Sequence, residues 1–166
     1  MKKFLLALIL SVATLQPVSA QSYRGFADIE AGIIISSSGW IKDPIIGITT
    51  THGVQLAEMF FIGAGTGILT NIHSAAMPLF CDLRFDWFSG KKVSPFIDLK
   101  TGYTLKITDA IYDNIDSGLY LNPTIGCRIR LNNRTGINIG LSYNSVRCDD
   151  WSSPAHAIAI KAGIDF

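Results

Sequence analysis

The segment Leu79-Phe80-Cys81-Asp82-Leu83-Arg84-Phe85-Asp86-Trp87-Phe88 decides the fold class of this chain. Its odd-numbered residues are all apolar, whereas three of its even-numbered residues, Asp82, Arg84 and Asp86, are charged. Successive side chains point to opposite faces of a β-strand, so the segment predicts a strand with one apolar face and one charged face. Its length is close to the roughly 9–11 residues with which a tilted strand crosses a membrane.

The same period of two recurs along the chain after residue 20 and predicts eight strands separated by turn-rich segments. No linker or low-complexity segment interrupts the series, so we expect a single domain. The strands are expected at Tyr23–Ile33, Ile45–Gln55, Phe60–Leu69, Leu79–Phe88, Ser94–Lys106, Leu119–Leu131, Ile137–Asn144 and His156–Phe166.

Thirteen charged residues fall within these segments, and each lies on the polar face of its own strand. If each further charged residue of a strand fell on either face at random, this distribution would arise about once in 250 cases. An Arg or Lys turned towards lipid at the middle of a bilayer costs about 2–4 kcal/mol, which explains why such positions are avoided. The residues are Arg24, Asp28, Glu30, Asp82, Arg84, Asp86, Asp98, Lys100, Lys106, Arg128, Arg130, Lys161 and Asp165.

The composition indicates which way the polar faces point. The chain is 48% hydrophobic with a mean hydropathy of +0.32, yet no continuous apolar segment of 18 residues follows Ala20. The polar faces also contain large aromatics and many glycines, which suit a barrel lumen better than a solvated surface. A soluble lipocalin-like ligand-binding barrel, with its apolar faces inward, is the alternative. The aromatics are Phe26, Phe80, Phe88, Phe96 and Tyr120, and the glycines are Gly32, Gly47, Gly53, Gly63, Gly65, Gly67, Gly102 and Gly126.

The connections between the segments alternate in length. Short links are expected at Ala57–Met59, Ser89–Val93 and Asn132–Gly136, and longer ones at Ile34–Pro44, Thr70–Pro78, Ile107–Gly118 and Ser145–Ala155. Outer-membrane barrels have short periplasmic turns and longer outer loops. The sequence therefore predicts an all-β fold, an eight-stranded antiparallel up-and-down transmembrane β-barrel with both termini in the periplasm.

Residues 1–20 are expected to be a cleaved signal peptide, which leaves a barrel domain at residues 21–166. Lys2 and Lys3 precede an apolar run, and Val18-Ser19-Ala20 has the small-x-small pattern of a cleavage site. The last ten residues, Ala157–Phe166, alternate and close on an aromatic.

In these features the chain resembles the small eight-stranded outer-membrane barrels of the OmpA/OmpX type, over essentially all of residues 21–166. The resemblance implies a C-terminal insertion signal, with Ile160, Ile164 and Phe166, that the outer-membrane insertion machinery recognises. It also implies contact with outer-membrane lipids and lipopolysaccharide. Aromatics near the strand ends are expected to form interfacial girdles. They are Tyr23, Phe60, Trp87 and Phe166 on the periplasmic side, and Tyr103 and Tyr143 on the outer side.

Twelve of the thirteen charged strand residues, all except Lys106, are expected to form a lumen charge network. If lumen positions of the fourth and fifth strands pair so that their numbers sum to 182, Arg84 faces Asp98 and Asp82 faces Lys100. A register two residues shorter would oppose Asp82 to Asp98, which is unfavourable. We therefore expect mutually paired charges in a barrel plugged by its own side chains. A gated or proton-conducting path is the functional alternative.

Other constellations offer weaker hypotheses. His156 with Ser152 or Ser153 would suit a lipid A-modifying enzyme, but no motif of that class matches. Acidic loop residues would bind a divalent cation only if the loops met, and solvated acids are the alternative. Trp40 and Trp151 would contact lipopolysaccharide, a host surface or another protein, or else anchor the barrel at the membrane interface. The loop acids are Asp109, Asp113, Asp116, Asp149 and Asp150.

The expected function is therefore a non-enzymatic outer-membrane barrel that serves envelope structure, adhesion or loop-mediated binding. We expect a monomer with no cofactor and no catalytic or metal-binding residues. A net charge of +1 gives no indication of a nucleic-acid partner. Cys81, Cys127 and Cys148 lack metal-site spacing, and no disulfide is expected between Cys81 and Cys127, which fall on non-neighbouring strands.

Overall fold

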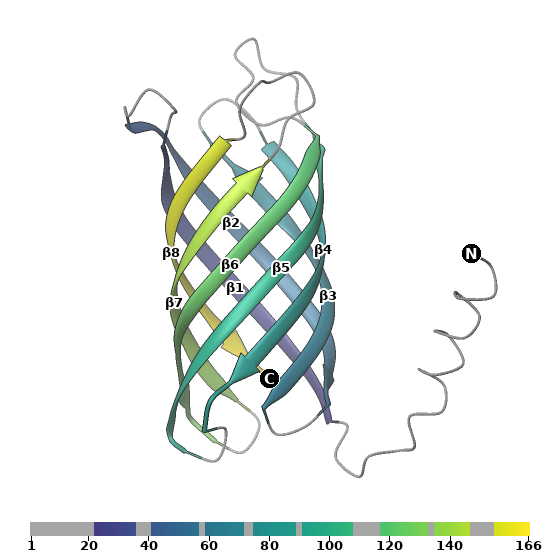
Figure 1. Ribbon diagram of the computed structural model, residues 1–166, viewed down its shortest axis with the longest axis vertical. Helices are drawn as coiled ribbons and strands as arrows, with labels where there is room; N and C mark the ends of the chain where they lie inside the picture. The colour runs from purple at the N-terminus through teal and green to yellow at the C-terminus, as the bar shows by residue number, and fades with distance from the viewer. Residues whose placement is uncertain are drawn as a thin grey trace, which may run out of the picture.

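The computed structural model describes residues 22–35, 41–56, 59–71, 75–88, 91–107, 117–132, 135–146 and 155–166. Eight antiparallel strands form a closed barrel in which each strand pairs with its neighbours in sequence and β8 pairs with β1 (Figure 1). The strands are β1 (Ser22–Ile35), β2 (Ile41–Gln55), β3 (Phe60–Thr70), β4 (Ala75–Asp86), β5 (Val93–Lys106), β6 (Gly118–Arg130), β7 (Gly136–Val146) and β8 (Ala155–Asp165). None of these residues forms a helix long and apolar enough to cross a membrane.

The prediction of an eight-stranded up-and-down barrel is confirmed. Each predicted strand overlaps one observed strand, and their ends differ by at most four residues. The register of β4 and β5 is also as predicted, since Asp82 lies opposite Lys100 and Arg84 opposite Asp98 in the ladder. The expected charge pairing is wrong, because Lys100 forms its ion pair with Asp28 and Arg84 with Asp86. Cys81 and Cys127 are free thiols exposed on the outer wall, as expected.

Two predicted connections are wrong in length. The segments Ile34–Pro44 and Thr70–Pro78 were expected to be long, but the strands continue into them and leave only residues 36–40 and 71–74. Ala75, Ala76 and Pro78 are weak strand formers, yet Ala76 pairs with Leu69 and Pro78 with Thr104. Neighbouring strands thus extend β4 beyond the limit that its own residues favour.

The prediction for Phe88 is also wrong. Alternation assigned it to the polar face, but β4 ends at Asp86 and Phe88 lies in the following turn with a φ of 56° and 58% of its surface exposed. Alternation holds only while the backbone remains extended. The left-handed conformation of Phe88 turns its ring away from the lumen.

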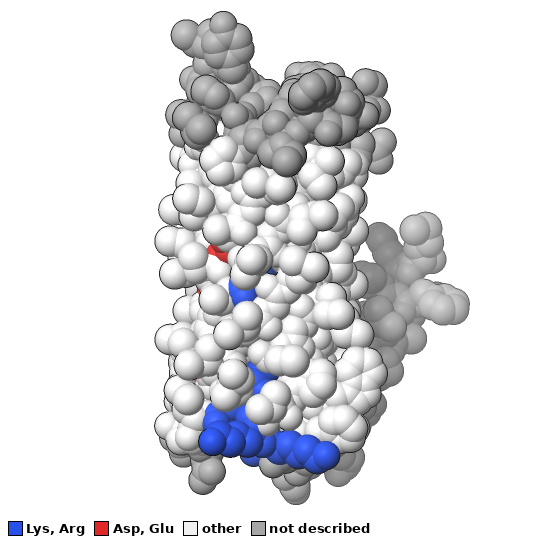
Figure 2. All heavy atoms as spheres, turned by 90° about the vertical axis from the view of Figure 1, so that its left-hand side faces the viewer, with Lys and Arg blue, Asp and Glu red and all other residues white. Residues whose placement is uncertain are grey.

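The outer wall of the barrel is apolar and the lumen is polar. Ile125 and Ile160 are 67% and 66% exposed. Figure 2 shows a mostly uncharged wall, with Lys and Arg atoms gathered near one end and a few charged atoms visible between the wall side chains at mid-height. Behind this wall Lys100 and Asp165 are almost completely buried. A soluble barrel with an apolar interior is therefore excluded for the part of the chain that the structure describes.

Candidate functional site: the filled lumen

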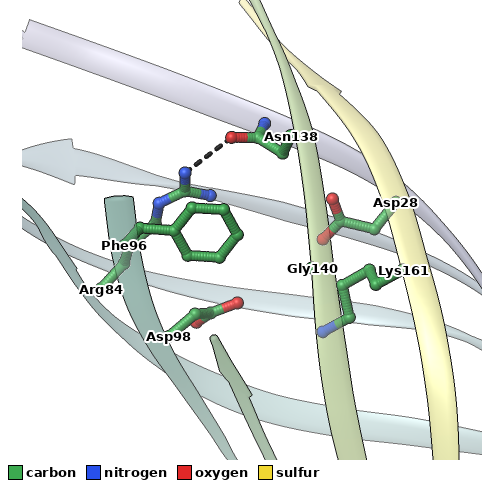
Figure 3. Close-up of a pocket in the computed structure, with 7 residues that line it drawn as sticks. All are labelled: Asp28, Arg84, Phe96, Asp98, Asn138, Gly140 and Lys161. Atoms are coloured by element: carbon green, nitrogen blue, oxygen red, sulfur yellow. Dashed lines mark hydrogen bonds between the residues drawn. The ribbon is translucent and has the colours of Figure 1, made fainter. Parts of the chain in front are cut away.

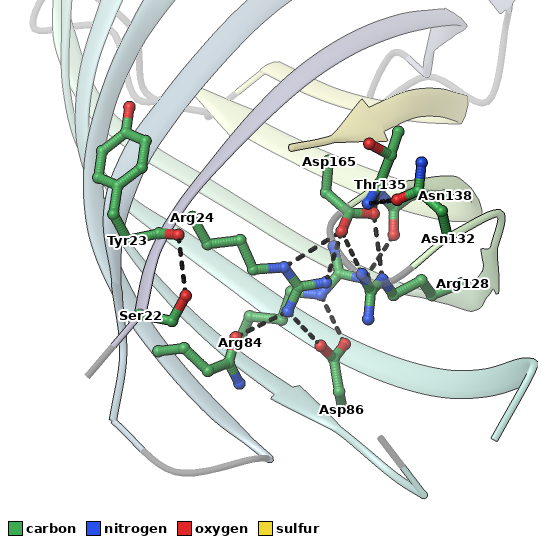
Figure 4. A network of polar contacts seen from close by, with 11 residues as sticks. Ser22, Tyr23, Arg24, Arg84, Asp86, Arg128, Asn132, Thr135, Asn138 and Asp165 are labelled. Carbon is green, nitrogen blue, oxygen red and sulfur yellow. Dashed lines mark hydrogen bonds and ion pairs between the residues drawn. The ribbon is translucent and has the colours of Figure 1, made fainter. Parts of the chain in front are cut away.

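The end of the lumen next to the termini contains an ion-pair network that we call the arginine layer: Arg24, Arg84, Asp86, Arg128, Asn138 and Asp165 (Figure 4). Arg24 joins two strands, because its Nη1 lies 2.6 Å from Asp86 Oδ2 and its Nη2 lies 3.2 Å from Asp165 Oδ2. Arg128 also pairs with Asp165, through Nη2 to Oδ2. All six side chains are buried, and each charge has at least one partner, as buried charges require.

Arg84 lies at the centre of the arginine layer. Its Nε donates to Asp86 Oδ1 at 2.7 Å, and its Nη2 donates to Asn138 Oδ1 at 2.6 Å. Its guanidinium carbon lies 3.7 Å from the centroid of the Phe96 ring and 4.7 Å from that of Phe26. The planar guanidinium is thus held by hydrogen bonds at its edge and by aromatic rings on its faces.

The middle of the lumen contains a second network, the lysine layer: Asp28, Glu30, Asp82, Asp98, Lys100, Asn122 and Lys161. Lys100 Nζ lies 2.7 Å from Asp28 Oδ2 and donates to Thr49 Oγ1 at 3.2 Å. Lys161 Nζ donates to Asn122 Oδ1 at 2.6 Å. Asn122 Nδ2 in turn donates to Glu30 Oε2 at 3.2 Å. The two ammonium groups therefore connect β1, β5, β6 and β8 across the lumen.

The boundary between the two layers is tightly filled. Figure 3 shows Arg84 and Phe96 on one side of it and Asp28 and Lys161 on the other. The gap at this boundary is too narrow to hold a water molecule. It is lined by Asp28, Arg84, Phe96, Asp98, Asn138, Gly140 and Lys161. Small residues make room for large ones, since a Cβ added to Gly65 would lie 2.6 Å from the Phe80 ring.

An apolar cluster closes the opposite end of the lumen, and we call it the apolar plug. Phe80 and Tyr120 pack with ring centroids 5.8 Å apart, and Tyr120 is completely buried. The members come from every strand except β5, so they fill the cross-section from several sides. They are Ile34, Ile45, Leu69, Ala76, Phe80, Tyr120, Val146 and Ala157.

The twelve residues predicted as a lumen charge network divide unevenly between the layers. The arginine layer has three cations and two anions, and the half-buried Arg130 on its side adds a fourth cation. The lysine layer has two cations, Lys100 and Lys161, and four carboxylates. Formal charges therefore cancel over the lumen as a whole but not within each layer. One oxygen each of Glu30, Asp82 and Asp98 is buried without a hydrogen-bond partner.

The other predicted site residues lie on the outer wall. Tyr23, Trp87, Tyr103 and Tyr143 are all exposed and close to strand ends. Ile160, Ile164 and Phe166 face outward from the end of β8. Gly25 and Phe166 exchange two backbone hydrogen bonds, which extends the β1–β8 ladder to the last residue.

Sequence reasoning missed two features of the site. The apolar plug was not predicted, although Ile45 and Leu69 have the lumen parity of their strands. The pairing of Tyr143 with His156 was also missed; the Tyr143 hydroxyl is hydrogen-bonded to His156 Nδ1, with the rings stacked. Ser152, Ser153, Trp40, Trp151 and the five loop acids lie outside the described residues. Within the described ranges, no cluster of His, Cys, Asp or Glu has the geometry to hold a metal ion.

These features define a class: small eight-stranded β-barrels with an apolar outer wall and a lumen filled by side chains. The structure is similar to Neisserial surface protein A, with a TM-score of 0.69 and 12% identity over 89% of this chain and 98% of that chain. It is also similar to Ail, the attachment invasion locus protein of Yersinia pestis, in complex with a heparin analogue, with a TM-score of 0.52 and 14% identity over 89% of this chain and 99% of that chain. A third similar structure is the outer membrane enzyme PagL, with a TM-score of 0.50 and 11% identity over 84% of this chain and 99% of that chain. No protein-family model and no curated protein matches the sequence. At these identities the likeness establishes the fold.

Proposed function

We propose that the protein is an integral barrel of a Gram-negative outer membrane. The observation that carries this proposal is the separation of polarity across the barrel wall: apolar side chains such as Ile125 and Ile160 face outward, while charged strand residues such as Lys100 and Asp165 lie inside. Only a lipid environment stabilises such an outer surface over the whole wall. Residues 1–20 would direct export, and the outward-facing end of β8 would engage the insertion machinery.

The filled lumen supports a role for the outer surfaces of the protein. The arginine layer, the lysine layer and the apolar plug occupy successive levels of an interior that is only wide enough for side chains. We therefore propose a non-enzymatic role in envelope structure, adhesion or binding by the outer loops. Among proteins of this fold, Ail was crystallised with a heparin analogue and PagL is an enzyme, so the fold is compatible with both binding and catalysis.

Cell fractionation tests the membrane assignment. The protein should remain in the outer-membrane fraction after a carbonate wash, which removes peripheral and soluble proteins. It should also migrate differently in SDS gels before and after boiling, because a closed barrel has no free edge strand and opens only as a whole. Release by carbonate, together with the absence of a heat-dependent shift, would contradict the proposal.

A lipid-modifying enzyme is a second candidate because of one arrangement on the outer wall. His156 pairs with Ser145 across the β7–β8 ladder, and both occupy outward positions of their strands. A histidine beside a hydroxyl is one element of a hydrolytic site, but the observed hydrogen-bond partner of His156 is the Tyr143 phenol. Mass spectrometry of lipid A from cells with the wild-type protein, with His156→Ala or with neither tests this. Identical lipid A profiles would leave the non-enzymatic role.

A further inference from the structure

The turn between β4 and β5 combines exposed aromatic and cationic side chains. Trp87, Phe88, Lys91 and Lys92 are all exposed. Lys91 N donates to Phe88 O at 2.9 Å and Ser94 Oγ donates to the same oxygen at 2.8 Å, which fixes the turn. Lys91 Nζ lies 4.5 Å from the centroid of the Phe88 ring. The left-handed backbone of Phe88 therefore directs its ring to the surface, close to a lysine ammonium.

A third cation lies beside this turn. The backbone N of Arg130 donates to Lys92 O at 2.8 Å, so the end of β6 is attached to the turn. Lys91, Lys92 and Arg130 are the described Arg and Lys side chains that are not buried, and no acidic residue of the described ranges pairs with them. Figure 2 shows Lys and Arg atoms gathered at the lower end of the molecule, below the uncharged wall. Among the described residues, this end therefore presents two fully exposed lysines without an acidic partner.

An aromatic ladder extends from this turn along the outer wall. The ring centroids of Phe60 and Phe85 are 4.9 Å apart, as are those of Phe85 and Trp87. Phe60 and Trp87 are 53% and 43% exposed. Aromatic side chains at this level of a barrel belong to the membrane–water interface, where one side contacts acyl chains and the other contacts headgroups.

We propose that Lys91 and Lys92 bind the phosphate of an anionic phospholipid whose acyl chains pack on the Phe60–Phe85–Trp87 ladder. Two exposed cations without acidic partners match an anionic headgroup, and the adjoining aromatic wall matches the hydrocarbon of the same molecule. A free phosphate would use only the cations and leave the ladder without a role. This inference rests on the proposed membrane location and adds a lipid class and a leaflet, the one on the side of the chain termini.

Native mass spectrometry of the full-length mature barrel in detergent tests the site, with phosphatidylglycerol and phosphatidylcholine of identical acyl chains offered in equal amounts. The wild type should retain phosphatidylglycerol preferentially. Lys91→Gln with Lys92→Gln should reduce that preference by roughly fivefold for each lysine removed. Lys106→Gln, at the opposite end of β5, is the matched control and should leave it unchanged. Trp87→Ala should lower retention of both lipids.

The heat-dependent gel shift is measured for every variant and separates the two proposals. A missing shift in the wild type contradicts the membrane barrel itself. A normal shift with equal retention of the two lipids, or with a preference that the double variant keeps, overturns the lipid site alone. Displacement of phosphatidylglycerol by the same concentration of inorganic phosphate would also overturn it, because the cations would then be a site for free anions.

Discussion

Lys100 Nζ lies 2.7 Å from Asp28 Oδ2, and this ion pair connects β5 to β1 across the middle of the lumen. Both side chains are buried, and the two residues lie 72 positions apart in the sequence. Removing one partner of a buried pair leaves an uncompensated charge and typically costs about 3–5 kcal/mol. This contact therefore provides a direct test of the lumen network.

We predict that Lys100→Met lowers the free energy of unfolding by about 3–5 kcal/mol. Asp28→Asn should lower it by less, because Asp82, opposite Lys100 in the ladder, remains as a carboxylate near the ammonium group. The double variant should be destabilised by less than the sum of the two single-variant effects, because it no longer contains the unpaired charge. Urea unfolding in lipid vesicles, followed by tryptophan fluorescence, measures these changes. Lys92→Met, on the exposed turn, is the control and should change stability by no more than about 0.5 kcal/mol. Additive effects in the double variant would show that the two residues do not interact.

The assignment of faces in β4 gives a second prediction. Leu83 is 51% exposed on the outer wall, whereas the neighbouring Asp82 is buried in the lumen. Leu83→Arg should prevent insertion or lower stability by up to about 2–4 kcal/mol, because it exposes a charge to lipid. Asp82→Asn should be milder, since it keeps a polar group in a polar interior. Quantifying the heat-shifted band in outer membranes compares the two, and equal tolerance would contradict the assignment of faces.

Gly65 gives a third prediction, because it allows β2 and Phe80 to approach closely. An added Cβ would lie 2.3 Å from Thr50 O and 2.6 Å from the Phe80 ring. Gly65→Val should therefore lower the free energy of unfolding by roughly 1–3 kcal/mol through overpacking. Ala64→Val is the matched control, since Ala64 is exposed on the lipid-facing wall and has room for extra methyl groups. If the two variants unfold at the same urea concentration, the lumen is less tightly packed at this level than the structure indicates.

The strand-level pattern could be predicted from the sequence because it depends on parity. Charges avoid lipid, so parity assigned the members of the network to the polar face of their strand, where Asp82, Arg84 and Lys100 are buried. Avoidance of opposed carboxylates set the register of Asp82 with Lys100. The ion pair of Lys100 with Asp28 could not be predicted in this way. It depends on which strands face each other across the closed barrel, and therefore on closure and tilt rather than on pairing between neighbours.

Local backbone geometry accounts for the remaining errors. Phe88 follows the parity of β4 in sequence but lies beyond the strand end in a left-handed conformation. Pro78 looked like a loop residue, yet it pairs with Thr104 inside the barrel. The apolar plug was not predicted, although parity alone places Ile45 and Leu69 on the lumen face of their strands.

The last prediction is that the barrel carries no open pore. Ions would have to pass the apolar plug, where Tyr120 and Leu69 are completely buried, and then both charged layers. The gap between Arg84 and Lys161 does not admit a water molecule, and an eight-stranded interior is only about wide enough for side chains. Planar-bilayer recording of the purified protein should therefore be silent or show rare small flickers. Tyr120→Ala should remain silent as well, because the arginine and lysine layers still fill the lumen below it. Large, stable and reproducible conductance steps from the wild type would contradict a plugged barrel and favour a channel, whereas steps from Tyr120→Ala alone would identify the plug as the sole barrier.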